Sequence, residues 1–379
     1  MLQLKIFFRR NRQKLGMIST RLRCPITGAG RFQPMNCVVI PAYRAAATIL
    51  PVIKAIGPEI EMIIVVDDGC PEGTALVVAN RCSDPRVVPL MHDTNRGVGG
   101  AFLTGMRYAI THGADIIIKI DADGQMDPSQ VPALIHPIAS GQADYVKGDR
   151  FFFLTNAASM PKARLIGNLA LSFMAKLSSG YWTIMDPTNG FFAIHARVAE
   201  LLDDERITKR FFFETDLLFH LGLIRAKVVE FPMHASYGEE VSNLRISHQL
   251  APFFSGHLRN TFRRILYRYF FREFSLASIQ LVVGTALFGF GLVFGSYHWW
   301  AAGDQLVPTG TIMIAALTFL IGFQLMLSFL NYDISSSPRE PLHPFLIRAP
   351  NLAAVTDDLA KASAPAASDD GPQTVRRQA

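Results

Sequence analysis

From Met35 onward, short runs of apolar residues alternate with longer segments in which apolar residues recur every three or four positions. Buried strands that alternate with helices are typical of a mostly parallel sheet covered by helices on both faces. We therefore predict an α/β domain over residues 35–250. The predicted strands are Cys37–Ile40, Met62–Asp67, Val87–Met91, Ile116–Ile120 and Tyr145–Lys147. The predicted helices are Ala46–Ile56, Gly99–His112 and Ser129–Ile138.

Two much longer apolar stretches follow this domain. No Asp, Glu, Lys or Arg occurs between Glu273 and Asp304, or between Asp304 and Asp333. Each stretch exceeds the roughly 20 apolar residues that a helix needs to cross the core of a bilayer. We therefore predict a transmembrane hairpin over residues 276–331, with spans at about 276–300 and 307–331.

Positive charge gathers at two places, which explains the net charge of +6. One is the N-terminal arm, residues 1–34, and the other is an arginine cluster that precedes the first span. Basic residues next to a span mark the cytoplasmic side and attract anionic lipid. We therefore attribute the charge to a membrane partner and expect no nucleic-acid partner. The cluster contains Arg259, Arg263, Arg264, Arg268 and Arg272.

Residues 251–275 combine these arginines with apolar side chains such as Leu258 and Phe262 at helical spacing. This pattern predicts an amphipathic juxtamembrane helix that lies in the membrane interface. The connection between the spans has no Lys or Arg, so both ends of the hairpin should be cytoplasmic. We expect a multi-pass protein of the inner (plasma) membrane whose α/β domain is cytoplasmic. Residues 332–379 are predicted to be a largely disordered cytoplasmic tail.

Polar residues follow several of the predicted strands, and in open α/β sheets ligands bind at the carboxyl ends of the strands. The first strand leads into Pro41-Ala42-Tyr43, the second into Asp67-Asp68-Gly69, and the fourth into Asp121-Ala122-Asp123-Gly124-Gln125. Carboxylates of this kind suit Mg²⁺ or Mn²⁺ that carries a diphosphate. Because such a pair occurs by chance in many chains, its meaning depends on the other motifs.

Six motifs in a fixed order carry a resemblance to a known family. They are Val39-Ile40-Pro41-Ala42-Tyr43, Val66-Asp67-Asp68-Gly69, Asn95-Arg96-Gly97-Val98-Gly99-Gly100, Asp121-Ala122-Asp123-Gly124-Gln125, Gly148-Asp149-Arg150 and Asp186-Pro187-Thr188-Asn189-Gly190-Phe191. From Met35 to about Leu244 the sequence resembles glycosyltransferase family 2, and within it the polyprenyl-phosphate glycosyltransferases similar to dolichol-phosphate mannose synthase. The resemblance implies a nucleotide-binding domain of the GT-A type, here followed by the interfacial helix and two transmembrane helices.

The resemblance also implies roles for individual residues, which we take as expectations. The nucleotide-sugar site would contain Pro41, Tyr43, Asp67, Asp68, Gly97, Asp121, Ala122 and Asp123. The Mg²⁺ or Mn²⁺ ligands would be Asp121, Asp123 and Gln125, and the catalytic candidates are Asp123, Asp186, Arg150 and Glu214. The acceptor and membrane candidates are Arg245, Arg259, Arg263 and Arg264. Asp67 would bond the nucleotide base, whereas Asp68 would organise the turn or contact ribose.

Two positions depart from the family pattern, because Cys70 and Asp149 stand where serine is usual. Asp149 adds negative charge close to Arg150, which puts the role of that arginine in doubt. The expected reaction is an inverting transfer of a sugar from a UDP- or GDP-linked donor to a polyprenyl phosphate. Because the phosphate is already anionic at neutral pH, a strong base is unnecessary, and positioning matters more.

Two alternatives remain open at the level of the sequence. A processive polysaccharide synthase would carry a Gln-x-x-Arg-Trp motif and more spans, but no tryptophan here follows an arginine. An inactive membrane scaffold would not need the acidic ligands that this chain retains. A homo-oligomer is plausible because Gly284, Gly289, Gly291 and Gly295 offer small faces for helix contact. The sugar and the nucleotide are not identified by the sequence.

Overall fold

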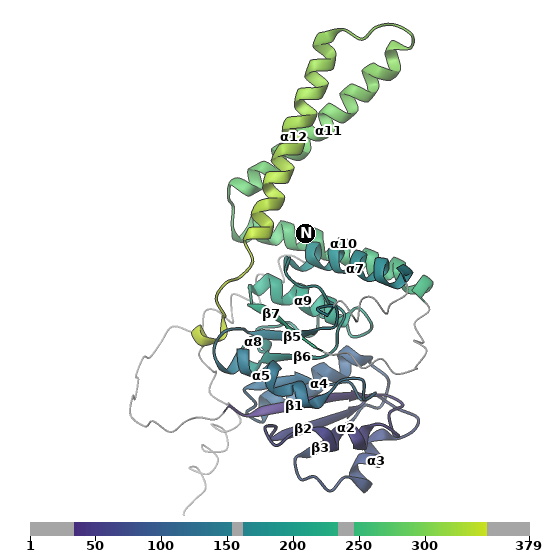
Figure 1. Ribbon diagram of the computed structural model, residues 1–379, viewed down its shortest axis with the longest axis vertical. Helices are drawn as coiled ribbons and strands as arrows, with labels where there is room; N and C mark the ends of the chain where they lie inside the picture. Colours follow the sequence, from purple (N-terminus) through teal and green to yellow (C-terminus); the bar gives the residue numbers. More distant parts are fainter. Residues whose placement is uncertain (1–33, 154–161, 234–245, 347–379) are drawn as a thin grey trace, which may run out of the picture. The chain divides into compact units, whose positions relative to one another are not determined.

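The computed structural model describes residues 34–153, 162–233 and 246–346, without the side chains of 162–166 and 246–250 (Figure 1). The predictions for the N-terminal arm and for Arg245 lie outside these described residues, as does most of the predicted C-terminal tail. Everything that follows concerns the described part of the chain.

A seven-stranded sheet forms the centre of the catalytic domain, with the order β3-β2-β1-β4-β6-β5-β7. The strands are β1 (Asn36–Ala42), β2 (Met62–Asp67), β3 (Val87–Met91), β4 (Ile116–Lys119), β5 (Tyr145–Asp149), β6 (Phe192–His195) and β7 (Val228–Pro232). β1 pairs in parallel with β2 and β4, and β5 pairs in parallel with β7. β6 is antiparallel to both of its neighbours. The prediction of a mostly parallel sheet is confirmed, although the sequence did not reveal β6 or β7.

The alternation of side chains along each strand divides the core into two layers. Val39 of β1 and Val66 of β2 pack in the cluster that contains residues of α4 (Val98–Thr111) and α9 (Phe213–Ile224). Val38 and Val65 pack in the cluster on the other face, which contains residues of α2 (Ile49–Ala55) and α5 (Val131–Ala139). Both faces of the sheet are therefore covered, which is why its strands are continuously apolar. The helices of the domain are α2 (Ile49–Ala55), α3 (Thr74–Arg81), α4 (Val98–Thr111), η1 (Pro128–Gln130), α5 (Val131–Ala139), α7 (Lys162–Ser179), α8 (Ala196–Ala199) and α9 (Phe213–Ile224).

The predicted amphipathic segment consists of the end of α10 (Ile246–Leu266) and a π-helical stretch, η2 (Tyr267–Arg272). α10 packs against α7 and α9, and Figure 1 shows α7 and α10 side by side. On the opposite side of α10, Phe254, Leu258 and Phe262 are all more than half exposed. Their spacing of four residues makes one continuous apolar stripe along the helix.

Two helices, α11 (Leu276–Ala302) and α12 (Thr309–Ser335), are long and apolar enough to cross a membrane by length and composition. They pack against each other, and a Cβ at Gly284 or Gly291 would meet backbone atoms of α12. A Cβ at Gly295 would meet Ala315, whereas Gly289 has open space around it. Three of the four glycines that we assigned to a homo-oligomer therefore serve contact within the hairpin, so they no longer argue for a second copy of the chain.

Residues beyond the predicted end of the second span make specific contacts with the rest of the fold. Asp333 of α12 is 1% exposed and accepts hydrogen bonds from Arg264, Tyr269 and Trp182. Further on, a short 3₁₀ turn, η3 (His343–Phe345), contacts the α/β domain, where the backbone amide of His343 donates to Asp144 at 2.8 Å. Residues 332–346 therefore return to the domain, and the prediction of disorder for the rest of the tail lies outside the described residues.

Candidate active site

The two acidic residues that follow β2 are buried, and backbone amides hold both. The Asp67 carboxylate accepts hydrogen bonds from the amides of Cys70 and Ala75, each at 2.8 Å. Asp67 is only 1% exposed, so it shapes the turn that leads into α3 and is not presented to a nucleotide base. This placement argues against the base-binding role that we expected for Asp67.

Asp68 organises the neighbouring segment, as one of its two expected roles required. Its carboxylate accepts from the amides of Arg96 and Gly97 at 2.8 Å and 2.7 Å, and it lies 2.8 Å from Nδ1 of His92. The other ring nitrogen of His92 lies 2.9 Å from the hydroxyl of Thr104, on α4. The carboxylate therefore ties the end of β2 to the start of α4.

The glycines that open α4 allow a close approach, but the approaching group belongs to the protein itself. Gly97 has a φ of 86°, and a Cβ there would meet the carbonyl of Lys209 and the side chain of Arg210. A Cβ on Gly99 would meet the ring of Phe213. The segment that begins α9 is therefore fitted against the glycine motif. It brings Glu214 to the edge of the sheet where Asp121 and Asp123 follow β4, which we call the acidic edge.

Asp121, the first carboxylate after β4, is paired with a lysine of the same strand. Nζ of Lys119 lies 2.5 Å from Asp121 and 3.4 Å from Glu214, and the lysine side chain is fully buried. Despite this burial, the two carboxylates raise the pKa of Lys119 above its ordinary value, so the side chain stays cationic. Lys119 therefore joins the acidic motif to α9 through one buried charge, while Asp121 remains 29% exposed.

Asp123 and Gln125 lie in the exposed turn that follows. The backbone amide of Gln125 donates to Asp123 at 3.0 Å, and the intervening Gly124 has a φ of 78° that favours glycine. Ala122 is buried, and its carbonyl accepts a hydrogen bond from Thr48 at 2.6 Å. These contacts fix the backbone of the turn while its acidic side chain faces outward.

The residues of this turn fit a magnesium or manganese ion that is bound together with its substrate. Such ions usually use one or two carboxylates, with the remaining positions filled by substrate phosphates and water. Asp123 and the part of Asp121 not bound to Lys119 satisfy that requirement. In the described part of the chain, no group of three or more His, Cys, Asp or Glu residues could hold a metal without such help.

Arg150 and Asp186 form a bidentate ion pair at the end of β5. Nε and Nη2 of Arg150 lie 2.7 Å and 2.9 Å from the two oxygens of Asp186, which is fully buried. The backbone amide of Asp186 donates to Glu230, whose pKa burial raises to about 7. Asp149 is buried too and accepts from the amide of Phe151 at 2.8 Å. Arg150 therefore stabilises a cluster of acids, and Asp186 is not presented as a free base.

At the end of β1, Tyr43 is about half exposed, with the guanidinium of Arg44 5.6 Å from its ring centre. Pro41 is buried in the strand beside it. Tyr43 therefore presents an aromatic face at the same edge of the sheet as Asp121 and Asp123, because β1 and β4 are parallel neighbours.

The arginines of α10 divide into two groups. Arg259 and Arg263 are exposed, as expected for membrane or acceptor contacts. Arg264 is 2% exposed and forms a bidentate ion pair with Asp333, with distances of 2.7 Å and 2.9 Å. Its assignment to the acceptor was wrong, because its guanidinium forms the ion pair that joins α10 to α12.

The sequence did not reveal Lys119, Lys147 or His92 as parts of the site. Lys119 and Lys147 pair with Phe192 from opposite sides in the sheet register, and both ammonium groups lie within 6 Å of its ring centre. Burial lowers the pKa of Lys147 to about 8. The only signal for either lysine is a charged residue inside a strand otherwise buried on both faces.

Comparisons with known proteins identify the family of this chain. The sequence profile described as glycosyl transferase family 2 matches residues 37–202. The chain is 30% identical over 216 residues to the UDP-N-acetylglucosamine–dolichyl-phosphate N-acetylglucosaminyltransferase of Methanococcus voltae, covering 53% of this chain and 86% of the relative. It is 28% identical over 200 residues to the undecaprenyl-phosphate mannosyltransferase of Micrococcus luteus, covering 52% and 81%.

Among solved structures, the chain is similar to glucosyl-3-phosphoglycerate synthase from Mycobacterium tuberculosis in complex with Mn²⁺, uridine diphosphate and phosphoglyceric acid. The TM-score is 0.46 at 20% identity, and the match covers 61% of this chain and 78% of that chain. The stronger finding is the sequence relative from Methanococcus voltae, most of whose length is matched. Together with the ordered motifs at the edge of the sheet, it shows that this chain belongs to glycosyl transferase family 2 and is a glycosyltransferase with a GT-A-type domain.

Proposed function

We propose that the protein transfers a sugar from a UDP- or GDP-linked donor to a polyprenyl phosphate at the cytoplasmic face of the inner membrane. The observation that carries the proposal is the continuity from the acidic edge of the sheet to a helix with an exposed apolar stripe. That helix, α10, is joined through Arg264 to a candidate membrane span. The relatives named for dolichyl-phosphate and undecaprenyl-phosphate acceptors support a lipid phosphate as the acceptor.

In the proposed reaction, an oxygen of the lipid phosphate attacks the anomeric carbon of the sugar from the side opposite the leaving group. The bond from that carbon to the diphosphate breaks, and its electron pair leaves with the nucleoside diphosphate. This single displacement inverts the anomeric centre. The attacking oxygen is already anionic, so the reaction does not require Asp186 or Glu214 to remove a proton. That is consistent with the ion pairs that hold both residues.

On the donor side, we assign Tyr43 to stacking with the base and Asp121 and Asp123 to a divalent cation, Mg²⁺ or Mn²⁺. The cation would neutralise the charge that develops on the leaving diphosphate. Lys119 fixes the position of Asp121, and Glu214 is held by the same lysine. Gly97 and Asp68 keep the start of α4 in place beside this edge.

The test is a donor screen with the full chain in detergent or nanodiscs, with undecaprenyl phosphate as the acceptor. UDP- and GDP-linked sugars are supplied separately with Mg²⁺ or Mn²⁺, and lipid products are identified by mass. We expect one polyprenyl-phosphate monosaccharide and one equivalent of free nucleoside diphosphate. A product that grows by repeated sugar addition would instead support a processive synthase. Absence of transfer and of donor binding with every donor would support the inactive scaffold.

A further inference from the structure

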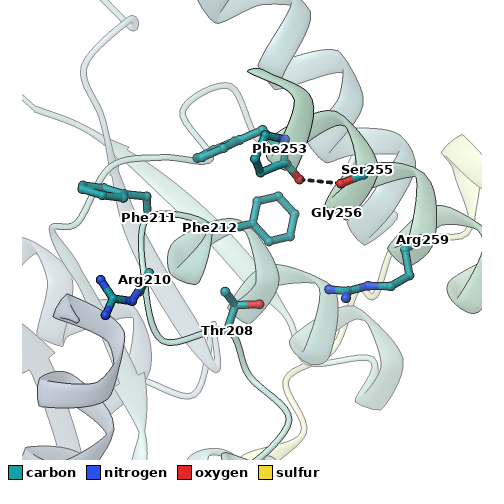
Figure 2. Close-up of a pocket in the computed structure, with 9 residues that line it drawn as sticks. Thr208, Arg210, Phe211, Phe212, Phe253, Ser255, Gly256 and Arg259 are labelled. Atoms are coloured by element: carbon teal, nitrogen blue, oxygen red, sulfur yellow. Dashed lines mark hydrogen bonds between the residues drawn. The ribbon is translucent and has the colours of Figure 1, made fainter. Parts of the chain in front are cut away.

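A cavity of about 550 Å³ lies between the segment that precedes α9 and the helix α10 (Figure 2). Its volume is within the usual range for sites that bind small ligands. The lining residues are Thr208, Arg210, Phe211, Phe212, Pro252, Phe253, Ser255, Gly256 and Arg259. None of the expected nucleotide or metal ligands lines it, so it is distinct from the acidic edge of the sheet.

The walls of this cavity are fixed by buried polar contacts. Asp216 of α9 accepts hydrogen bonds from both the amide and the hydroxyl of Thr208, and from the side chain of Asn260 on α10 at 2.6 Å. A Cβ on Gly256 would lie 2.9 Å from the ring of Phe212, so the glycine lets this ring pack against the helix. These contacts hold the walls of the cavity in place at the junction between α9 and α10.

The lining combines positive charge with aromatic surface. In Figure 2 the ring of Phe212 lies between Arg210 and Arg259; the guanidinium of Arg259 points toward Thr208, whereas that of Arg210 points away from the ring. Neither guanidinium has a hydrogen-bond or ion-pair partner among the residues that the structure describes, and none of the described lining residues is acidic. Phe211 is 59% exposed, so apolar surface also faces outward here. This chemistry complements a molecule with an anionic head and an apolar tail.

The surroundings indicate where such a molecule comes from and where it is used. The stripe of Phe254, Leu258 and Phe262 lies on the same helix as Arg259, which places the cavity beside an exposed apolar surface of the kind that binds a membrane interface. On its other side, the side chain of Arg210 approaches Gly97, and Glu214 reaches Lys119 of the acidic edge. The cavity therefore lies between the apolar stripe and the residues assigned to the donor.

We propose that this cavity binds the phosphate and the first isoprene units of the acceptor lipid, an inference that rests on the proposed function. Arg259 binds and orients the phosphate, Arg210 adds positive charge at the rim, and the rings of Phe211, Phe212 and Phe253 line the path of the isoprene units. The side of the cavity formed by the segment before α9, which contacts Gly97, then directs the phosphate oxygen toward the donor.

The kinetic test uses two variants with the same change of charge on the same helix. Arg259→Glu alters the cavity, whereas Arg263→Glu alters an exposed arginine that does not line it. We expect Arg259→Glu to raise the KM for undecaprenyl phosphate by about tenfold or more relative to Arg263→Glu, with the donor KM changed less than threefold in both. Equal changes in acceptor KM would mean that only the overall surface charge matters, which would overturn the proposal. Thermal unfolding of both variants checks that they fold alike.

A binding test separates this inference from the proposed function, because it does not require turnover. The full chain is photolysed with farnesyl phosphate that carries a diazirine on its terminal isoprene unit, and labelled peptides are mapped by mass. We expect label on the peptides that contain Phe211 and Phe253, with competition by unlabelled farnesyl phosphate and little by farnesol or phosphatidylglycerol. Label elsewhere, or equal competition by phosphatidylglycerol, would overturn the inference. Label in the cavity without sugar transfer to any acceptor would instead refute the proposed function alone.

Discussion

The two halves of the sheet hold their buried acids in different ways. In the half formed by β1, β2 and β3, backbone amides bind Asp67 and Asp68, and a histidine also lies beside Asp68. In the half that runs from β4 to β7, side-chain cations bind two of the acids, with Lys119 on Asp121 and Arg150 on Asp186, while Asp149 and Glu230 accept from backbone amides. Amide dipoles fix a turn in one geometry, whereas a cation shared between acids can be redistributed when a charged ligand arrives. The first half is thus a rigid frame, and the second is electrostatically responsive.

The largest expected effect follows from removing the shared cation. Lys119→Met leaves Asp121 and Glu214 without their counter-charge in a buried site, and breaking such a pair costs about 3–5 kcal/mol. We expect a matching loss in the free energy of unfolding, measured by denaturant titration of the solubilised protein. Adding Glu214→Gln should recover part of the loss, because one uncompensated carboxylate is then removed. If the double variant is less stable than Lys119→Met, the two halves do not differ in the way we describe.

The second effect concerns turnover and not stability. Asp123→Asn removes an exposed carboxylate that we assign to the metal, so transfer should fall by at least about 100-fold while the unfolding temperature stays close to that of the wild type. The matched control is Asp127→Asn in the same loop, because Asp127 caps a 3₁₀ turn and asparagine caps equally well. Transfer that survives in Asp123→Asn under metal-limited conditions would reject the metal assignment.

A smaller loss is expected in the half that is held by amides. Asp67→Asn keeps the shape of the side chain but replaces one accepting oxygen with an amino group, which then faces a backbone amide. The cost should be about 1.5–3 kcal/mol in the free energy of unfolding, as for a hydrogen bond to a charged group. Donor KM should change little if Asp67 only frames the turn. A large rise in donor KM with unchanged stability would restore the role of Asp67 in binding the base.

The smallest effect is a dependence of stability on pH at the junction of α10 with α7. His257 is 2% exposed, lies 2.9 Å from Ser178 on α7, and has its pKa lowered by burial to about 4. Because the unfolded chain binds a proton more readily, stability should fall as the pH drops from 6.5 toward 4, by about 1 kcal/mol between pH 7 and pH 5.5. Asn cannot titrate, so His257→Asn should weaken this dependence in thermal unfolding. An unchanged pH profile would contradict the assignment.

How far the sequence predicted this structure depends on the range of the contacts involved. The strands β1 to β4 were recognisable because each contains a run of apolar residues, whereas β6 directly follows the Asp186 motif without a break. The positions of Asp121 and Asp123 followed from the end of a strand. The ion pair between Asp121 and Lys119 did not, because it depends on the burial of Lys119 in the folded sheet.

The arginines of α10 illustrate the same limit. Helical periodicity predicted the helix and its apolar stripe, because both depend on residues within a few turns. It could not distinguish Arg259 from Arg264, since the partner of Arg264 is Asp333, 69 positions away. Similarly, three of the four glycines of α11 make close helix contacts, but the sequence did not say that these contacts are with α12 of the same chain.

Asp333 has a consequence for engineering. This one carboxylate receives the indole of Trp182, the guanidinium of Arg264 and the hydroxyl of Tyr269. Any exchange of the hairpin for an anchor from another protein would therefore have to import an acid at the same depth. A more hydrophobic replacement could insert into the bilayer and still leave these three donors without an acceptor. The enzyme would then be anchored in the membrane, but its catalytic domain would no longer be held to the anchor.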